Sequence, residues 1–124
     1  MAEKILIVED NAANQVLLRD ILLFHGYNVI TANNGPQGIQ MAVEEGPDLI
    51  IMDIQMPKMS GIEAIGLLKE NPSCSAIPII AVTSYAMPGD RDRLIGLGAT
   101  DYISKPIDTR AVPKIIESVL RSSR

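Results

Sequence analysis

Short apolar runs alternate with longer stretches of helical period along the whole chain. We expect strands near residues 4–9, 28–32, 48–53, 78–83 and 100–104. We expect helices near residues 12–25, 36–45, 61–70, 88–97 and 109–122. This alternation predicts an α/β fold built from five successive βα units, (βα)5, around a parallel sheet.

Three of the apolar runs contain no polar position: Ile5 to Val8, Leu49 to Met52 and Ile79 to Val82. In a strand with one face exposed to water, apolar and polar residues alternate. A strand covered by helices on both faces is apolar throughout. These runs are therefore predicted to be the central strands of a doubly wound sheet. Right-handed crossovers leave few topologies for such a sheet.

Two of the expected helices contain residues that disfavour helix. Gly89 and Gly96 lie in or beside the fourth helix, and each weakens a helix by about 1 kcal/mol relative to Ala. Pro113 lies in the last helix and removes a backbone hydrogen bond there. The fourth helix is thus predicted to be marginal and easily remodelled, and the last helix is predicted either to begin later or to bend.

Four runs end in polar residues with different chemistries. Glu9 and Asp10 follow the first run, Asp53 closes the third, Thr83 closes the fourth and Lys105 follows the fifth. The carboxyl ends of parallel strands lie along one edge of a sheet. We therefore expect these five residues to meet in a single crevice.

The carboxylates of Glu9, Asp10 and Asp53 would repel each other in such a crevice unless a cation neutralised them. Oxygen ligands with few protein atoms suit Mg²⁺, which shares its remaining positions with water and phosphate. The alternative is that Glu9 and Asp10 cap the next helix. A cap needs only one residue and explains neither Asp53 nor Lys105, so we predict a magnesium site.

Asp53 also has the position of a nucleophile, because it emerges from a buried strand. A carboxylate can attack a phosphoryl group when cations stabilise the charge that develops on the phosphoryl oxygens. Lys105 supplies one cation, and the hydroxyl of Thr83 can donate a hydrogen bond. The pattern indicates phosphoryl transfer to Asp53.

Composition narrows the classes of protein further. The 124 residues suit one domain spanning 1–124, with 47% hydrophobic and 21% charged residues. The net charge of -4 argues against nucleic acid as a partner. Cys74 is the only cysteine, so a reducing compartment is expected, and the first apolar run is too short for a signal peptide or membrane span. We expect a cytoplasmic protein without a membrane partner.

The chain resembles the receiver domain of two-component response regulators over essentially its whole length. The resemblance rests on the acidic pair, Asp53, Thr83, Tyr102 and the Lys105-Pro106 pair at these separations. The segments at residues 8–11 and 52–57 resemble those of stand-alone receivers and hybrid kinases. The resemblance implies a flavodoxin-like five-stranded sheet in the order 2-1-3-4-5.

The resemblance also implies roles for the residues of the crevice. Asp53 would be the phosphoacceptor. Asp10, Asp53 and the main-chain carbonyl of Gln55 would bind Mg²⁺, with Glu9 reaching the ion through water. Lys105 would pair with the acceptor at rest and with the phosphoryl group afterwards.

Further implied roles concern switching. Thr83 would move toward the phosphoryl group and Tyr102 would turn inward, changing the surface of the fourth helix, fifth strand and fifth helix. Ser84 would bind the phosphoryl group and, with Gln55, tune water access and phosphate lifetime. The peptide bond before Pro106 is expected to be cis.

The first helix has more apolar residues than one buried stripe requires. Leu17, Ile21 and Phe24 share one face, which we expect to be buried. Val16 and Leu23 lie on the other face. They are either scattered surface residues or a docking patch for a helical, histidine-bearing partner.

The primary hypothesis is a single-domain response regulator that catalyses only its own phosphorylation and dephosphorylation. It would accept a phosphoryl group from a histidine kinase or phosphotransfer domain, then regulate a protein target or pass the group on. A dehalogenase-type phosphatase is the alternative, but it needs a second Asp where this chain has Gln55. A flavin-binding module is a third reading, which Glu9 and Asp10 disfavour by repelling a phosphate.

Overall fold

Five parallel strands form a single sheet in the order β2-β1-β3-β4-β5. The computed structural model describes residues 2–56, 59–84 and 89–122. The strands are β1 (Lys4–Val8), β2 (Asn28–Ala32), β3 (Leu49–Asp53), β4 (Ile79–Thr83) and β5 (Asp101–Ser104). Each predicted strand is confirmed to within one residue at either end, and the strand order implied by the resemblance is confirmed as well.

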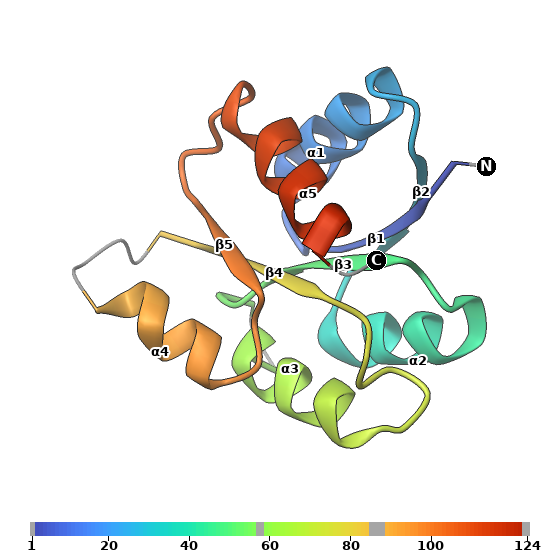
Figure 1. Ribbon diagram of the computed structural model, residues 1–124, viewed down its shortest axis with the longest axis vertical. Helices are drawn as coiled ribbons and strands as arrows, with labels where there is room; N and C mark the ends of the chain where they lie inside the picture. The colour runs from blue at the N-terminus through green and yellow to red at the C-terminus, as the bar shows by residue number, and fades with distance from the viewer. Residues whose placement is uncertain (1, 57–58, 85–88, 123–124) are drawn as a thin grey trace.

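Helices cover both faces of this sheet, as the apolar central strands predict (Figure 1). They are α1 (Ala12–Phe24), α2 (Gly35–Glu45), α3 (Gly61–Glu70), α4 (Asp90–Gly96) and α5 (Ala111–Ser122). Helices α1 and α5 lie on one face, and α2, α3 and α4 lie on the other. Among the residues that the structure describes, no helix is long and apolar enough to cross a bilayer.

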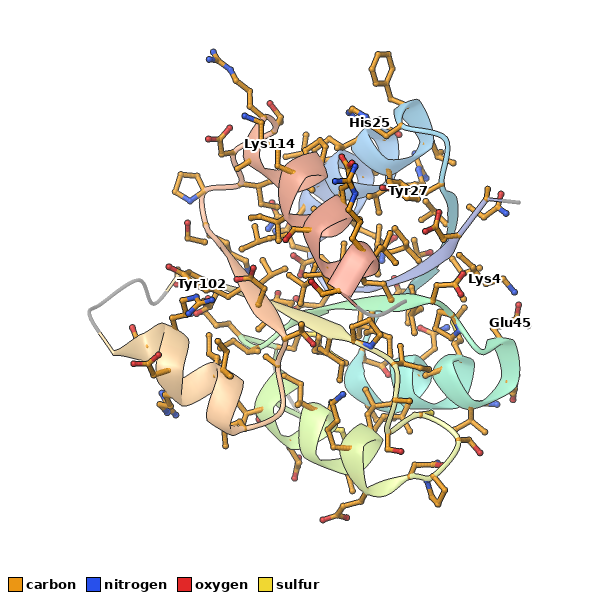
Figure 2. The ribbon with its side chains drawn as sticks, in the orientation of Figure 1. Lys4, His25, Tyr27, Glu45, Tyr102 and Lys114 are labelled. Atoms are coloured by element: carbon orange, nitrogen blue, oxygen red, sulfur yellow. The ribbon has the colours of Figure 1, made fainter. Side chains whose placement is uncertain are left out.

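The sheet divides the hydrophobic core into two clusters. Alternate residues of the central strands point to opposite faces, so Ile5 and Ile51 pack with α1 and α5 while Leu6 and Ile50 pack with α2 and α3. All five positions of β3 and of β4 are buried. Cys74, in the loop before β4, is buried in the second of these clusters. Figure 2 shows side chains filling both layers.

The buried face of α1 differs from the prediction. Leu18 and Leu22 are the fully buried residues of this helix, whereas Ile21 is only partly buried against the cluster. Phe24, which we expected to be buried, has 86% of its surface exposed. Apolar residues occur on both sides of α1, so helical period alone does not determine which side faces the sheet.

Helix α5 begins at Ala111, two residues later than expected. Pro113 therefore lies in the first turn, where a backbone N–H has no partner within the helix. The carbonyl of Asp108 accepts the first bonds of this helix, from the amides of Ala111 and Val112. Of the two outcomes that Pro113 predicts, a later start or a bend, the structure has the later start.

Helix α4 is short, with seven residues and one buried side chain, that of Leu94. It begins after Gly89, whose positive φ of 94° suits glycine, and no side chain caps this end. The helix ends at Gly96. Its few buried contacts support the prediction of a marginal helix.

Helix α3 starts in direct contact with the end of β3. A Cβ atom on Gly61 would lie 2.3 Å from the carbonyl oxygen of Asp53 and 2.4 Å from the Cα of Ile54. These are backbone atoms, which cannot rotate away as a side chain can. The absence of a side chain at residue 61 therefore allows α3 to pack against the strand that carries Asp53.

Substituting Gly61→Ala is expected to lower the free energy of unfolding by about 1–3 kcal/mol, because the added methyl group overlaps the backbone of β3. Gly66→Ala in the same helix is the matched control, since a Cβ there meets nothing within 4 Å. This control should stabilise the protein by about 1 kcal/mol. Urea unfolding measures both changes, and equal effects would contradict the packing argument.

Candidate functional site

Three carboxylates meet at the carboxyl edge of the sheet. Glu9 and Asp10 follow β1, and Asp53 closes β3, which pairs with β1 through Val8 and Met52. One oxygen of each acid lies within 4.8 Å of the other two. Glu9 and Asp53 are each only 1% exposed, whereas Asp10 is exposed. The predicted convergence of these acids is confirmed.

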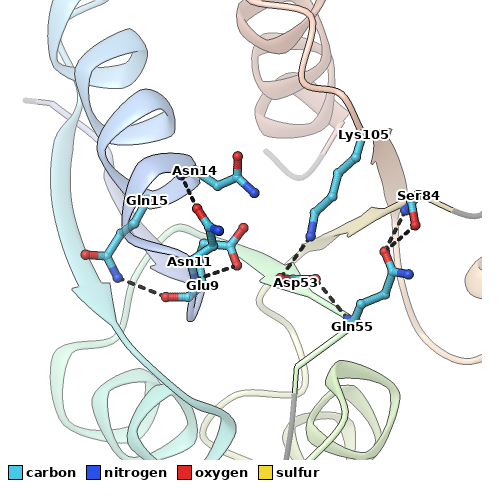
Figure 3. Close-up of polar contacts among 8 residues, drawn as sticks. All are labelled: Glu9, Asn11, Asn14, Gln15, Asp53, Gln55, Ser84 and Lys105. Atoms are coloured by element: carbon cyan, nitrogen blue, oxygen red, sulfur yellow. Dashed lines mark hydrogen bonds and ion pairs between the residues drawn. The ribbon is translucent and has the colours of Figure 1, made fainter.

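Lys105 approaches the same site from the end of β5 (Figure 3). Its Nζ lies 3.1 Å from Oδ2 of Asp53 and donates a hydrogen bond to it. Oδ1 of Asp53 accepts a bond of 2.9 Å from the main-chain N–H of Gln55. Both carboxylate oxygens are thus held in place. The peptide bond between Lys105 and Pro106 is cis, as the resemblance implied.

The loops after β3 and β4 are joined beside Asp53. Oε1 of Gln55 accepts hydrogen bonds of 2.7 Å from the Ser84 amide and 2.9 Å from the Ser84 hydroxyl. The preceding residue, Thr83, is fully buried at the end of β4. The structure therefore brings the predicted hydroxyl residues to the edge of the sheet that carries the acids.

The capping alternative for the acidic pair is wrong. Asn11 is the N-cap of α1, and its Oδ1 accepts a bond of 3.0 Å from the amide of Asn14. Glu9 instead accepts a bond of 3.3 Å from the amide of Asn11. Because another residue caps the helix, capping does not explain why two acids precede it.

Gln15 is a supporting residue that the sequence did not reveal. Its Nε2 donates to the main-chain oxygens of Glu9 and Ala32, at 3.0 and 3.3 Å, and to Oδ1 of Asn33 at 3.0 Å. This amide group ties the acidic loop to the end of β2. No spacing or motif marks a glutamine in the second turn of a helix for this role, and only the three-dimensional contacts identify it.

The pKa values of Glu9 and Asp53 are shifted in opposite directions, and the shifts indicate which of the two acids carries the negative charge. Burial raises the pKa of Glu9 to about 8, and the neighbouring Asp53 adds to the shift. Burial also disfavours ionised Asp53, but the neighbouring Glu9, the Gln55 amide and Lys105 together hold its pKa below the usual value. Asp53 is therefore the group that carries the charge, while Glu9 retains a proton.

Oε1 of Glu9 is buried and has no hydrogen-bond partner. A hard divalent cation would satisfy this oxygen and replace the proton on Glu9, since such ions bind carboxylate oxygens in groups of this kind. The donor set thus fits the cation that the sequence predicts.

The surrounding surface contains the remaining predicted residues. Tyr102 is partly buried against the cluster that includes Leu94, and Figure 2 shows it beside α4. Val16 and Leu23 on α1 are 42% and 52% exposed, as expected. These positions agree with the predicted locations, while the roles of the residues remain proposals.

Comparison with known proteins places the chain in a family. The family model described as "Response regulator receiver domain" matches residues 5–117. The polar-differentiation response regulator DivK of Brucella anthropi is 44% identical over 119 residues, which cover 96% of this chain and 94% of DivK. The chain belongs to the response regulator receiver domain family.

Solved structures agree with this assignment. The chemotaxis protein CheY4 of Vibrio cholerae aligns with a TM-score of 0.89 and 27% identity, over 96% of this chain and 99% of that one. The receiver domain of a sensor histidine kinase from Pseudomonas aeruginosa aligns with a TM-score of 0.87 and 31% identity, over 97% and 98%. That receiver was solved with a magnesium ion coordinated in its active-site cleft.

Without divalent metal, stability is expected to fall as the pH rises from about 5 toward 8. Below the ordinary pKa of 4.5, Glu9 is protonated in both states and its contribution is fully present. At higher pH the unfolded chain ionises Glu9 while the folded protein retains the proton, so this contribution is lost with a slope approaching about 1.4 kcal/mol per pH unit. Urea unfolding in chelator should show this slope.

Glu9→Gln is the comparison for this measurement, because an amide has no proton to lose over this range. The variant should lack the part of the slope that Glu9 causes. Parallel stability profiles for the variant and the natural chain would contradict a raised pKa at Glu9.

Proposed function

We propose that this chain is a Mg²⁺-dependent phosphoryl-accepting response regulator, with Asp53 as the acceptor and a histidine kinase or phosphotransfer domain as the donor. Family membership supports a role in two-component signalling. The observation that carries the assignment is the setting of Asp53, which is buried, ionised and in contact with Lys105 at 3.1 Å. A carboxylate in that setting is both fixed and reactive.

In the proposed transfer, a carboxylate oxygen of Asp53 attacks the phosphorus of a phosphohistidine. An O–P bond forms, the P–N bond breaks, and the imidazole leaves with the electron pair of that bond. Asp10, Asp53, the Gln55 carbonyl and, through water, Glu9 would hold Mg²⁺, which when bound supplies charge compensation for the incoming phosphoryl oxygens. The ammonium group of Lys105, which contacts Asp53, would compensate further negative charge on the phosphoryl group.

The response would be transmitted through Thr83 and Tyr102 to the surface formed by α4, β5 and α5. Thr83 lies beside the site and Tyr102 packs against the cluster under α4. A nearly complete change from the inactive to the active population requires about 5.5 kcal/mol of differential interaction. The short α4, with one buried side chain, offers little resistance to such a change. A downstream protein target would bind the altered surface, or the phosphoryl group would pass to another histidine.

The phosphatase alternative is disfavoured by the residue two positions after Asp53. That enzyme class needs a carboxylic acid there, whereas Gln55 presents an amide whose oxygen accepts bonds from Ser84. An amide has no acidic proton to give to a leaving group. Membership of the receiver domain family independently favours the signalling switch.

Incubation with acetyl phosphate and Mg²⁺ is expected to add about 80 Da to the intact protein, the mass of one phosphoryl group. Asp53→Asn should abolish the adduct because an amide is not a nucleophile, and chelator should abolish it in the natural chain. Asp20→Asn, a surface acid of α1, is the control and should be labelled normally. An adduct that persists in Asp53→Asn would identify a different acceptor and overturn the proposal.

Val16 and Leu23 are proposed to dock the donor protein beside the acidic site. Both are exposed apolar residues on α1, the helix that begins next to Glu9 and Asp10. A helix carrying the donor histidine would cover this apolar surface as it approaches Asp53. Small phosphodonors need no such surface. Comparing them with a protein donor therefore distinguishes a loss of docking from a loss of phosphoryl transfer.

The pair Val16→Glu and Leu23→Lys is expected to slow transfer from a phosphorylated histidine phosphotransfer partner by about tenfold or more, because the apolar contact is replaced by charge. Labelling by acetyl phosphate should not change. Val43→Glu with Leu67→Lys is a matched control, since these residues are 45% and 43% exposed on α2 and α3. Equal transfer rates for the two double variants would remove the docking assignment.

A further inference from the structure

The side chain of Gln55 spans the edge of the site from the β3 loop to the β4 loop (Figure 3). Its Oε1 accepts both hydrogen bonds that Ser84 can donate, at 2.7 Å from the amide and 2.9 Å from the hydroxyl. The main-chain N–H of the same glutamine donates to Oδ1 of Asp53 at 2.9 Å. One residue thus contacts the acceptor through its backbone and the opposite loop through its side chain.

The amide and hydroxyl donors of Ser84 matter because a phosphoryl group on Asp53 would bring several negatively charged oxygens to this edge. Lys105 already contacts Asp53, and the donors of Ser84 lie on the side occupied by Gln55. Hydrogen bonds to a charged oxygen are about twice as strong as those to a neutral one. A phosphoryl oxygen is therefore a better acceptor for Ser84 than the amide oxygen of Gln55.

We propose that the Gln55 side chain is a latch that occupies the Ser84 donors in the unmodified protein and releases them to the phosphoryl group. This inference rests on the proposed function and deepens it. The latch stabilises the unmodified state, so it opposes phosphorylation. Ser84 directly follows Thr83 in the chain, so its release from Gln55 links the latch to the switch.

The latch predicts a specific effect of losing the Oε1 acceptor. Gln55→Met keeps the length of the side chain but removes the acceptor, and Gln55→Ala removes both. With saturating Mg²⁺, each variant should bind beryllofluoride, a phosphoryl mimic, about fivefold more tightly than the natural chain, the worth of about one net hydrogen bond. The amide resonance of Ser84 should shift in both variants before any beryllofluoride is added.

Gln40→Met is the matched control. Its carboxamide makes a surface bond of 2.9 Å to Glu44 on α2, remote from Ser84, so its affinity for beryllofluoride should equal that of the natural chain. Titrations followed by NMR report the affinities and the Ser84 amide together.

Three results would overturn the latch. Weaker binding by Gln55→Met would make the glutamine a ligand of the phosphoryl group. Tighter binding by Gln55→Ala alone would indicate that space, not a hydrogen bond, limits access. Unchanged affinity in both variants would show that the contact opposes nothing. Failure of the proposed function has a different signature, because Asp53→Asn would then bind beryllofluoride as the natural chain does.

Discussion

The mutual repulsion of three carboxylates at one edge of the sheet is the constraint around which the rest of the site is arranged. Burial of Glu9 and Asp53 makes this repulsion costly, since few water molecules can screen the charge. The Lys105 ammonium and the Gln55 amide stabilise Asp53 as an ion, and Glu9 takes up a proton instead. In the metal-free protein, Glu9 must therefore lose one proton before the site has the charge that suits a divalent cation.

The central strands were predictable because their physics is local. Runs without polar residues, such as those in β3 and β4, are buried completely only when helices cover both faces. This requirement places them in the centre of the sheet. The convergence of Glu9, Asp53 and Lys105 followed from the same argument, since parallel strands share a carboxyl edge. A local rule, the missing N–H of Pro113, also limited α5 to a late start or a bend, and the structure has the late start.

Other features depend on contacts that sequence spacing does not encode. The phase of α1 was wrong because apolar residues occur on both sides of that helix, and only packing against the sheet and α5 selects Leu18 and Leu22. The partners of the Gln15 and Gln55 side chains were hidden for a related reason. A glutamine side chain can reach many partners, and its actual partners are known only when the loops have been placed.

The packing of Gly61 has a consequence for the direction in which a signal can travel. Helix α3 rests directly on the backbone that carries Asp53, with its first amide 3.3 Å from the carbonyl oxygen of Ile54. Close backbone packing therefore holds α3 and the strand that carries the acceptor together. Helix α4 has only one buried side chain and no side-chain cap, so fewer contacts oppose a change of position there than at α3.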